Sequence, residues 1–365
     1  MGMAKGRYGY AGNGVVSSLP WKEDMGTAPL RDHSLDGGRK AGALIDPQGR
    51  CLDYLRLAVT DRCNLRCRYC MPDTGVPATA PGETLSFDEL TRACAVLVGA
   101  GVRKIRITGG EPLARRGVVE WMGELTQLAP GLEILLTTNG VLLEEHLPGL
   151  VEAGLKRVNL SLDTLDPDTW KLITRREGFA AARRSIDVVL EAGIGLKVNV
   201  VVQPGVNDHE ILDFVELTRE RPMAVRFIEP MPFSGSDTMD IPPVSGTWIR
   251  ERIASAYSIR PLHRGQGDVD CRFGIDGHAG TVGIIEGNSR SFCGDCRRLR
   301  LNARGELRTC LYGSPQADLR EALRSGATDP QLLALIASAV GRRLEDGHAA
   351  EAAGEGAISM ARIGG

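Results

Sequence analysis

The chain has 365 residues, of which 42% are hydrophobic and 25% charged, a composition typical of a globular protein with a substantial core. Its net charge of −2 provides no overall positive field, so composition gives no indication of nucleic acid or an anionic membrane as partner. Residues 1–24 lack an apolar signal segment, and no run approaches the roughly 20 apolar residues of a membrane span. We therefore expect a cytoplasmic protein.

The first 48 residues differ from the rest of the chain. They are rich in Gly, polar and charged residues without periodicity, which predicts a disordered or loosely docked extension. From Leu52 onward, short β-rich runs alternate with helical patterns, as in repeated β/α units. The predicted strands are Tyr54–Thr60, Lys104–Thr108, Glu133–Thr138, Arg157–Asp163, Leu196–Val202 and Ala224–Glu229.

Three positions are predicted to start helices between these strands. Ser86 with Glu89 forms a capping box, Asp166 is followed by Pro167, and Asn207 is a further candidate cap. The helix after Ser86 is expected to have an apolar face of Leu90, Ala93, Cys94 and Leu97, and the helix after Asn207 one of Ile211, Phe214 and Val215. A later helix is expected to have an apolar face of Leu332, Leu333, Ile336 and Val340.

One side of the predicted sheet is polar. Lys104 and Arg106 alternate with Ile105 and Ile107, and the fourth and fifth strands show the same alternation, whereas a strand covered on both faces is nearly continuously apolar. An exposed sheet face is one explanation, but a barrel lumen that holds a polar ligand is favoured. We predict an α/β protein with an incomplete (β/α)6 TIM-like barrel over residues 49–235. An α+β region at 236–345 would close its open side, followed by a tail at 346–365.

Six of the nine cysteines form two groups, and short spacings in a large chain without a secretion signal indicate metal binding. Cys63, Cys67 and Cys70 form C-x3-C-x2-C directly after the first strand, at the end of the sheet where active sites lie. Zinc usually takes C-x2-C pairs and four ligands, and no fourth Cys or His is nearby in sequence. Three thiolates instead suit a 4Fe–4S cluster with one open iron, with zinc as the alternative.

This first motif, with Tyr69 before its last cysteine, resembles the signature of the radical S-adenosylmethionine enzymes. The resemblance implies that the open iron binds S-adenosylmethionine and that cleavage releases a 5′-deoxyadenosyl radical. Residues 108–112, TGGEP, are similar to a glycine-rich motif of the same family. The implied cofactor contacts are Tyr69, Gly110, Ser161 and Met231.

A second cysteine group lies near the end of the chain. Cys293, Cys296 and Cys310 form C-x2-C-x13-C, which suits either structural zinc, with Cys271 or His278 as fourth ligand, or a second cluster with a free iron. The cluster is favoured. Five arginines fall between 297 and 308, and such a run is either a solvated face or a triphosphate clamp, because guanidinium groups match phosphate oxygens bidentately.

Together the two groups resemble the GTP 3′,8-cyclase family, from about Tyr54 to the terminal SMARIGG. The resemblance implies that the radical removes the ribose 3′ hydrogen of GTP and that the carbon radical attacks guanine C8. The product is (8S)-3′,8-cyclo-7,8-dihydroguanosine 5′-triphosphate, in the first step of molybdopterin (molybdenum cofactor) biosynthesis. Implied cofactors are two 4Fe–4S clusters and S-adenosylmethionine. Implied partners are GTP, a reducing electron donor and a downstream cyclic pyranopterin monophosphate synthase, for a monomer or homodimer.

The same resemblance implies which residues contact GTP. They are Arg56, Arg106, Thr137, Lys197, Arg298, Leu299 and Arg300, and the terminal Gly364 and Gly365 are implied to reach the active site as catalytic residues. The polar strand faces support Arg106 and Lys197 independently, whereas Arg56 alone would pass as a surface charge.

Two other functions fit parts of this pattern. One is a two-cluster radical enzyme that modifies a peptide, although such enzymes commonly have more cysteines in their second half. The other is a zinc-stapled binding module without catalysis, against which the charged strand faces count, because a scaffold has no use for buried charge.

Overall fold

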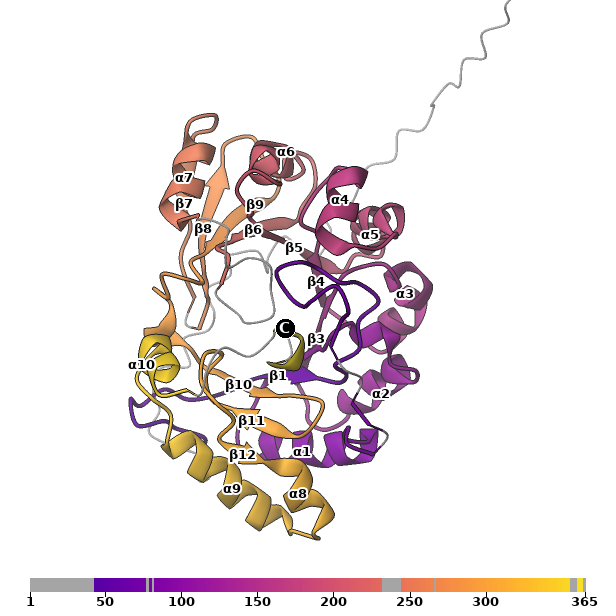
Figure 1. Cartoon of the computed structure of the whole chain (residues 1–365), viewed down its shortest axis with the longest axis vertical. Coiled ribbons are helices and arrows are strands. Elements are labelled where there is room, and N and C mark those ends of the chain that lie inside the picture. Colours follow the sequence, from indigo (N-terminus) through magenta and orange to yellow (C-terminus); the bar gives the residue numbers. More distant parts are fainter. Residues whose placement is uncertain are drawn as a thin grey trace, which may run out of the picture. The chain divides into compact units, whose positions relative to one another are not determined.

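A curved sheet of twelve strands runs through the part of the chain that the structure describes (Figure 1). The structure is a computed structural model, and it describes residues 43–76, 79–80, 82–231, 244–265, 267–354 and 360–363. The strand order is β12-β11-β10-β1-β2-β3-β4-β5-β6-β9-β8-β7. All neighbours from β10 to β9 pair in parallel, and the outer pairs at both ends are antiparallel.

The six predicted strands are confirmed, with ends that differ from the expected ones by at most two residues. They are β1 (Tyr54–Ala58), β2 (Lys104–Thr108), β3 (Glu133–Thr138), β4 (Arg157–Ser161), β5 (Gly195–Val201) and β6 (Ala224–Ile228). The helices that connect or follow them are α1 (Phe87–Gly99), α2 (Val118–Leu125), α3 (Leu143–Glu152), α4 (Pro167–Thr174), α5 (Phe179–Glu191) and α6 (Ile211–Glu216). Short 3₁₀ turns lie at η2 (Pro112–Ala114) and η3 (Asp208–Glu210). These helices lie outside the row of strands, as expected for an incomplete (β/α)6 barrel (Figure 1).

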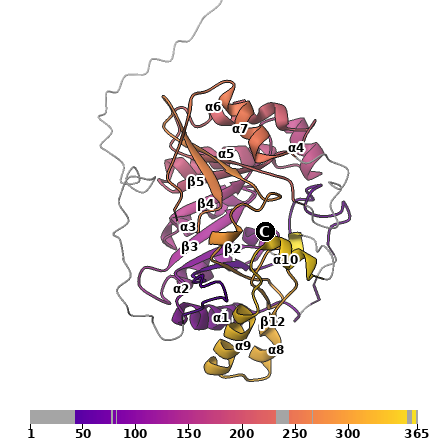
Figure 2. The ribbon, with the colours of Figure 1, turned by 90° about the vertical axis from the view of Figure 1, so that its left-hand side faces the viewer.

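The later part of the chain extends this sheet at both edges. Its strands are β7 (Ile259–Pro261), β8 (Asp270–Ile275), β9 (Thr281–Ile285), β10 (Arg298–Leu301), β11 (Glu306–Arg308) and β12 (Ala317–Asp318). Its helices are α7 (Gly246–Ala254), α8 (Leu319–Arg324), α9 (Asp329–Gly341), α10 (Gly347–Ala352) and α11 (Met360–Ile363), with a 3₁₀ turn at η5 (Cys293–Asp295). Because β10 pairs with β1 and β9 with β6, both halves of the chain form one sheet (Figure 2).

Most helix starts follow the sequence signals. Ser86 and Glu89 form the predicted capping box of α1, and Asp166 accepts a hydrogen bond from Thr169 N at the start of α4. Asn207 occupies the N-cap position of η3, which leads into α6, but its side chain makes no cap bond. Its amide instead donates to Asp163 O (2.6 Å) and Val201 O (2.9 Å). Asn207 therefore ties together the ends of β4 and β5.

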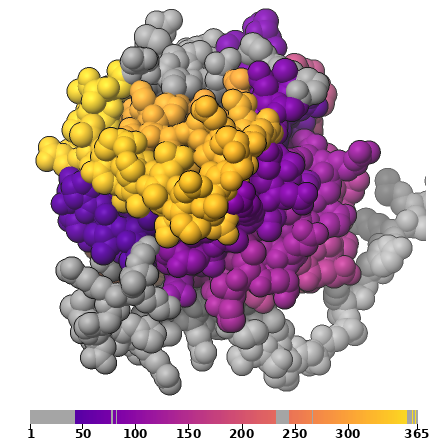
Figure 3. All heavy atoms as spheres, turned by 90° about the horizontal axis from the view of Figure 1, so that it is seen from below, coloured from indigo at the N-terminus to yellow at the C-terminus, as the bar shows by residue number. Residues whose placement is uncertain are grey.

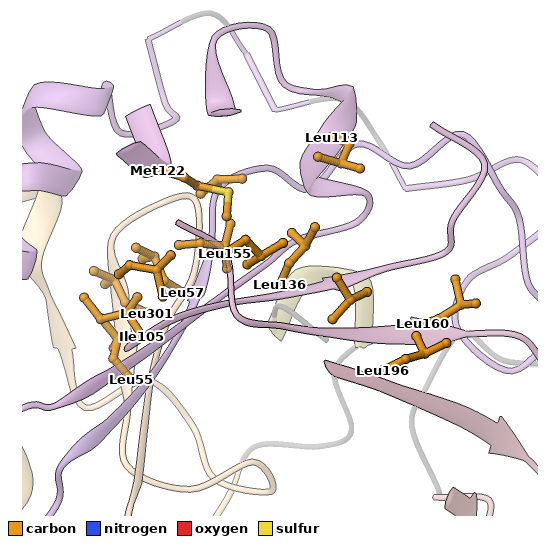
Figure 4. Close-up of a cluster of buried hydrophobic side chains, with 14 of the residues drawn as sticks. Leu55, Leu57, Ile105, Leu113, Met122, Leu136, Leu155, Leu160, Leu196 and Leu301 are labelled. Carbon is orange, nitrogen blue, oxygen red and sulfur yellow. The ribbon is translucent and has the colours of Figure 1, made fainter. Parts of the chain in front are cut away.

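The two faces of the strands separate apolar from polar side chains. On β2, Ile105 and Ile107 are buried in the core, whereas the alternate residues face a cavity. Figure 4 shows the same core layer across the sheet, where Leu301 of β10 lies beside its register partner Leu57 of β1. The layer includes Leu55, Ile105, Leu136, Leu160 and Leu196. One continuous apolar layer therefore holds β10 to the barrel.

Helices α8 and α9 pack against α1, so that late residues cover an early helix (Figure 3). Arg324 donates to Glu89 (2.7 Å), and Arg92 to Asp329 (2.9 Å). The apolar face predicted for α9 is confirmed: Leu332, Ile336 and Val340 are buried and Leu333 is half-buried. This docking fixes the region that carries the second cysteine group onto the barrel.

Candidate active site

A cavity of about 590 Å³ runs along the inner face of the barrel strands, from first residues such as Tyr54 and Lys104 to the loops after the carboxyl ends, and is lined by candidate residues of both chain halves. All six clustered cysteines line it: Cys63, Cys67, Cys70, Cys293, Cys296 and Cys310. The two groups are more than 220 residues apart in sequence, and the pairing of β10 with β1 brings them to the same space. The cavity therefore meets the main geometric requirement of the sequence-based hypothesis.

The loop of the first cysteine group is held by backbone contacts with the glycine-rich turn after β2. Gly110 N donates to Thr60 O and Glu111 N to Arg62 O, both at 2.8 Å. A Cβ atom on Gly110 would lie 2.3 Å from Arg62 O. The sequence suggested that this glycine lets backbone approach a ligand, but the structure shows that it already lets the cysteine loop approach.

Glu111 connects this turn to the next one. Its buried carboxylate accepts hydrogen bonds from Leu113 N (3.1 Å), Thr138 Oγ1 (2.8 Å) and Asn139 N (2.8 Å). Burial raises the pKa of Glu111 to about 7. Sequence reasoning did not assign this role, because the partners come from the end of β3. The Glu111 carboxylate therefore links the turn after β2 to the end of β3, beside the loop of the first cysteine group.

The three cysteines of the first group are half-buried and line the same cavity. Cys63 Sγ accepts from Leu65 N at 3.4 Å and lies 3.9 Å from Asn139 Nδ2. Burial raises the pKa of Cys63 to about 11, and burial together with the neighbouring Asp163, Cys70 and Cys63 raises the pKa of Cys67 well above its ordinary value. Such thiols ionise when a metal centre supplies positive charge, so the donor set fits a metal centre.

The four implied cofactor contacts, Tyr69, Gly110, Ser161 and Met231, all line the cavity. Tyr69 donates its hydroxyl proton to Asp163 Oδ2 at 2.8 Å, and burial raises the pKa of Asp163 to about 6. Met231 Sδ lies 3.4 Å from the hydroxyl of Tyr312, two residues after Cys310. The Met231 side chain therefore contacts the part of the cavity wall that follows the second cysteine group.

The second cysteine group is anchored by an ion network from the start of the described chain. Arg50 donates to Cys293 O (2.8 Å) and pairs with Asp46 (2.6 Å), whose fully buried side chain also lies 3.4 Å from Arg343. The network was not predicted, since Asp46 falls in the segment read as a loose extension. Residues 43–52 are instead anchored, with Leu44 and Leu52 buried in the core.

Neither of the proposed fourth zinc ligands lines the cavity. His278 Nδ1 lies 2.9 Å from Thr218 Oγ1, and Cys271 lies on β8. Within the described ranges, no three His, Cys, Asp or Glu side chains are arranged to hold a metal ion.

Six of the seven implied GTP contacts line the cavity: Arg56, Arg106, Thr137, Lys197, Arg298 and Arg300. Strand register explains this, because Arg300, Arg56 and Arg106 are partners across β10, β1 and β2. Leu299 differs because it lies between Arg298 and Arg300 on β10, and successive side chains of a strand point to opposite faces. Its side chain is therefore fully buried in the core. Any contact of Leu299 with a ligand must come from its main chain.

Six further residues line the cavity that the sequence analysis did not predict as site residues. They are Tyr54, Lys104, Arg157, Asn159, Arg226 and Asp270. Arg226 follows the same period of two along β6 that revealed the other polar faces, so that signal could have identified it. Asp270 was not recognisable, because β8 reaches the cavity only through its pairing with β9.

The cavity wall is short of negative charge. Burial and the neighbouring Arg226 lower the pKa of Lys197 to about 7, and burial lowers the pKa of Arg300 to about 10. Several buried polar atoms have no hydrogen-bond partner within the described part of the chain: Thr137 Oγ1, Asn159 Oδ1, Arg298 Nε and Arg300 Nη1. Because buried polar groups are nearly always bonded, this wall is suited to a polar, anionic ligand.

Comparison with known proteins places the chain in a family. The profile of the Radical SAM superfamily matches residues 57–218, and that named Molybdenum Cofactor Synthesis C matches residues 223–349. A GTP 3′,8-cyclase from Moorella thermoacetica is 44% identical over 302 residues, which cover 82% of this chain and 93% of the relative. The chain belongs to the GTP 3′,8-cyclase family.

Other relatives of this family agree. The GTP 3′,8-cyclase of Geobacter sulfurreducens is 43% identical over 88% of this chain and 99% of the relative. A mitochondrial GTP 3′,8-cyclase from Arabidopsis thaliana is 43% identical over 82% of this chain and 77% of its own length. Members of the radical SAM superfamily use S-adenosylmethionine and an iron–sulfur cluster, and this chain is such an enzyme.

Solved structures show the same fold at low identity. SuiB from Streptococcus suis matches with a TM-score of 0.53 and 14% identity over 78% of this chain and 68% of that protein. The structure of anSMEcpe with bound AdoMet matches with a TM-score of 0.52 and 14% identity, over 77% of this chain and 79% of that protein. These matches support the incomplete barrel and carry no conclusion about substrate. No helix within the described ranges has the length and apolar character to cross a membrane.

Gly364 and Gly365 lie outside the described residues. Nearby, α11 lies inside the ring of strands in Figure 1, and Met360 at its start lines the cavity.

Proposed function

We propose that the chain catalyses the radical S-adenosylmethionine-dependent cyclisation of GTP to (8S)-3′,8-cyclo-7,8-dihydroguanosine 5′-triphosphate, the first step of molybdopterin (molybdenum cofactor) biosynthesis. The observation that carries the proposal is one cavity lined by both cysteine triads and by basic residues from six parallel strands. Relatives that are 43–44% identical to the chain are GTP 3′,8-cyclases. A peptide-modifying enzyme with two clusters is the less favoured alternative.

Cys63, Cys67 and Cys70 would hold a 4Fe–4S cluster, because three soft thiolate donors on one loop match its ligand preference. When bound there, the cluster and S-adenosylmethionine supply a 5′-deoxyadenosyl radical for removal of the ribose 3′ hydrogen of GTP. The chain's own residues orient the cofactor and keep competing reactants away. Tyr69, Gly110, Ser161 and Met231 are the proposed cofactor contacts.

Cys293, Cys296 and Cys310 would hold a second 4Fe–4S cluster on the opposite side of GTP. The triphosphate would lie against Arg56, Arg106, Thr137, Lys197, Arg298 and Arg300, with a main-chain contact from Leu299. Three of these arginines are register partners on adjacent strands, so their guanidinium groups can reach successive phosphates. The base would lie at the second triad.

The terminal Gly364 and Gly365 are proposed to enter the cavity and take part in catalysis. The support is Met360, which precedes them by a few residues and lines the cavity. Deleting both glycines should leave iron content and GTP binding intact and abolish cyclisation. Full cyclase activity in the truncated chain would contradict this role.

We further propose the division of the chain suggested by its sequence: an extension at 1–48, of which residues 43–48 are anchored to the rest of the chain, the radical SAM barrel at 49–235, the second-cluster region at 236–345 and a tail at 346–365. A cytoplasmic monomer or homodimer that takes electrons from a reducing donor fits the proposed chemistry. A downstream cyclic pyranopterin monophosphate synthase would consume its product, and neither nucleic acid nor a membrane is expected as partner.

The test is anaerobic reconstitution followed by iron and sulfide analysis and assays with GTP, S-adenosylmethionine and a reductant. About eight irons per chain and GTP-stimulated formation of 5′-deoxyadenosine are expected, since each triad holds four irons. Cys296→Ala should retain about four irons and lose the cyclic product. Zinc without iron, or 5′-deoxyadenosine formation stimulated by peptide and not by GTP, would refute the proposal.

A further inference from the structure

Tyr54, the first residue of β1, lies at the centre of the cationic wall. Its register partners are Lys104 on β2 and Arg298 on β10, so basic residues flank it on both sides. All three side chains line the cavity. The only aromatic ring among these register partners is therefore placed between two cations from opposite neighbouring strands.

The hydroxyl of Tyr54 orients a third cation. Arg106 Nε donates to Tyr54 OH at 2.6 Å, and Arg106 Nη1 donates to Leu136 O at 2.9 Å. Two of the nitrogens of this guanidinium are thereby directed at protein groups, which fixes the plane of the fork. Without the hydroxyl, one bond to the Leu136 carbonyl would remain, and the guanidinium could rotate about it.

The ring of Tyr54 lies near the other two cations, one of which, Lys104, also pairs with Glu133 (3.4 Å). The guanidinium carbon of Arg298 lies 5.3 Å from the ring centroid, and Lys104 Nζ lies 5.9 Å from it. Both distances are in the range of cation–π attraction, which counteracts the mutual repulsion of neighbouring positive charges. The ring can thus hold both cations at the wall before any phosphate is present.

We propose that Tyr54 is a positioning residue for the triphosphate of GTP: its hydroxyl orients Arg106 and its ring holds Arg298 and Lys104. The inference rests on the proposed function of the cavity and adds to it the residue that pre-arranges the phosphate-binding cations. Pre-arrangement matters because a guanidinium group that is already oriented loses less entropy when a phosphate binds.

The ionisation of Tyr54 agrees with this geometry. Burial raises its pKa, but the charges of Arg106, Arg56 and Arg298 outweigh this effect and lower the pKa to about 7. Arg226 on β6 is also close enough to feel the charge of Tyr54, and Lys104 faces the ring. A phenol in such surroundings is a strong hydrogen-bond donor, and a phosphate oxygen is a suitable acceptor for its proton.

Two substitutions separate the hydroxyl from the ring. Tyr54→Phe keeps the ring and removes the hydrogen bond to Arg106, so we expect KM and Kd for GTP to rise about tenfold with kcat within about twofold. Tyr54→Leu also removes the cation–π contacts and should raise both by about a further fivefold. Kd is measured by calorimetry on the reconstituted protein with GTP and with guanosine, which has no phosphates. Guanosine binding should change by less than about twofold in both variants.

Tyr257→Phe is the matched control, because Tyr257 bonds Glu216 at the surface and does not line the cavity. It should leave GTP affinity, iron content and activity unchanged. Iron per chain and far-ultraviolet circular dichroism should also stay at wild-type values in both Tyr54 variants.

Three results would overturn the inference. One is wild-type affinity for GTP in Tyr54→Phe and Tyr54→Leu, and another is an equal loss for GTP and guanosine. The third is a loss of iron or helical signal that accounts for the weaker binding, which would make Tyr54 a residue of the fold. If the wild-type protein itself does not bind GTP, the proposed function fails and this inference fails with it.

Discussion

Gly110→Ala tests how the cysteine loop is held. The new Cβ would lie 2.3 Å from Arg62 O and 2.9 Å from Asp61 O, both of them backbone atoms that cannot rotate away. A carbon–oxygen contact needs about 3.3 Å, so the Arg62 peptide must move by about 1 Å. The movement strains the bonds Glu111 N to Arg62 O and Gly110 N to Thr60 O. Together with overpacking, we expect a local cost of about 2–4 kcal/mol.

The consequence should appear at Cys63, the residue after Arg62. A displacement of about 1 Å in a catalytic loop can cost on the order of 100-fold in rate. Iron per chain should fall toward four in the variant, and 5′-deoxyadenosine formation with excess reductant should fall by about that factor. GTP binding, which depends on strand residues, should change little. Gly99→Ala is the control, since its Cβ meets nothing within 4 Å at the end of α1. Native iron content and cleavage rate in Gly110→Ala would refute the reasoning.

Three further predictions concern other parts of the structure. Asp46→Asn leaves Arg50 and a second buried arginine without their carboxylate, at a cost of about 3–5 kcal/mol, so iron should fall toward four per chain by loss at the second triad. Ser86→Ala removes the capping box of α1 and should cost about 1 kcal/mol, seen as a lower midpoint of thermal unfolding. Between pH 6 and 8, GTP affinity should fall, because Lys197 loses its positive charge and Tyr54 gains a negative one, both with a pKa of about 7.

Two of these predictions have a matched control variant. Asp329→Asn breaks an exposed ion pair with Arg92 and should cost at most about 1 kcal/mol with full iron. Eight irons in Asp46→Asn, or an unchanged melting midpoint in Ser86→Ala, would contradict the respective prediction. In a Lys197→Met, Tyr54→Phe double variant the fall of affinity with pH should disappear, and its persistence would show that other groups cause it.

The barrel could be predicted because its information is local. Apolar residues at every second position of β2, β4 and β5 define both the core face and the cavity face, so Arg106 and Lys197 were recognised from sequence. The late strands are two to six residues long, and their partners are distant in sequence. The arginines of β10 could be read only as a run of charge, although Leu299 between them marks a strand with one face in the core.

Residues whose role depends on a partner in another loop could not be predicted. Asn207 looks like a helix cap, but its amide serves the ends of two strands. Asp46 lies among polar residues without periodicity, and only the fold shows that Arg50 and Arg343 surround it. The chemistry of each side chain was visible in the sequence, whereas the distance to its partner was not.

The pairing of β1 with β10 also affects the chain while the ribosome synthesises it. Arg50 and Cys293, which meet beside this pair, are separated by 243 residues. At about 5–20 residues per second, a ribosome needs roughly 10–50 s to make the intervening chain. During that time β1 has an open edge, and unpaired strand edges promote aggregation. Nascent chains that stall before β10 should therefore depend strongly on chaperones, and the first triad should become enclosed only when translation is nearly finished.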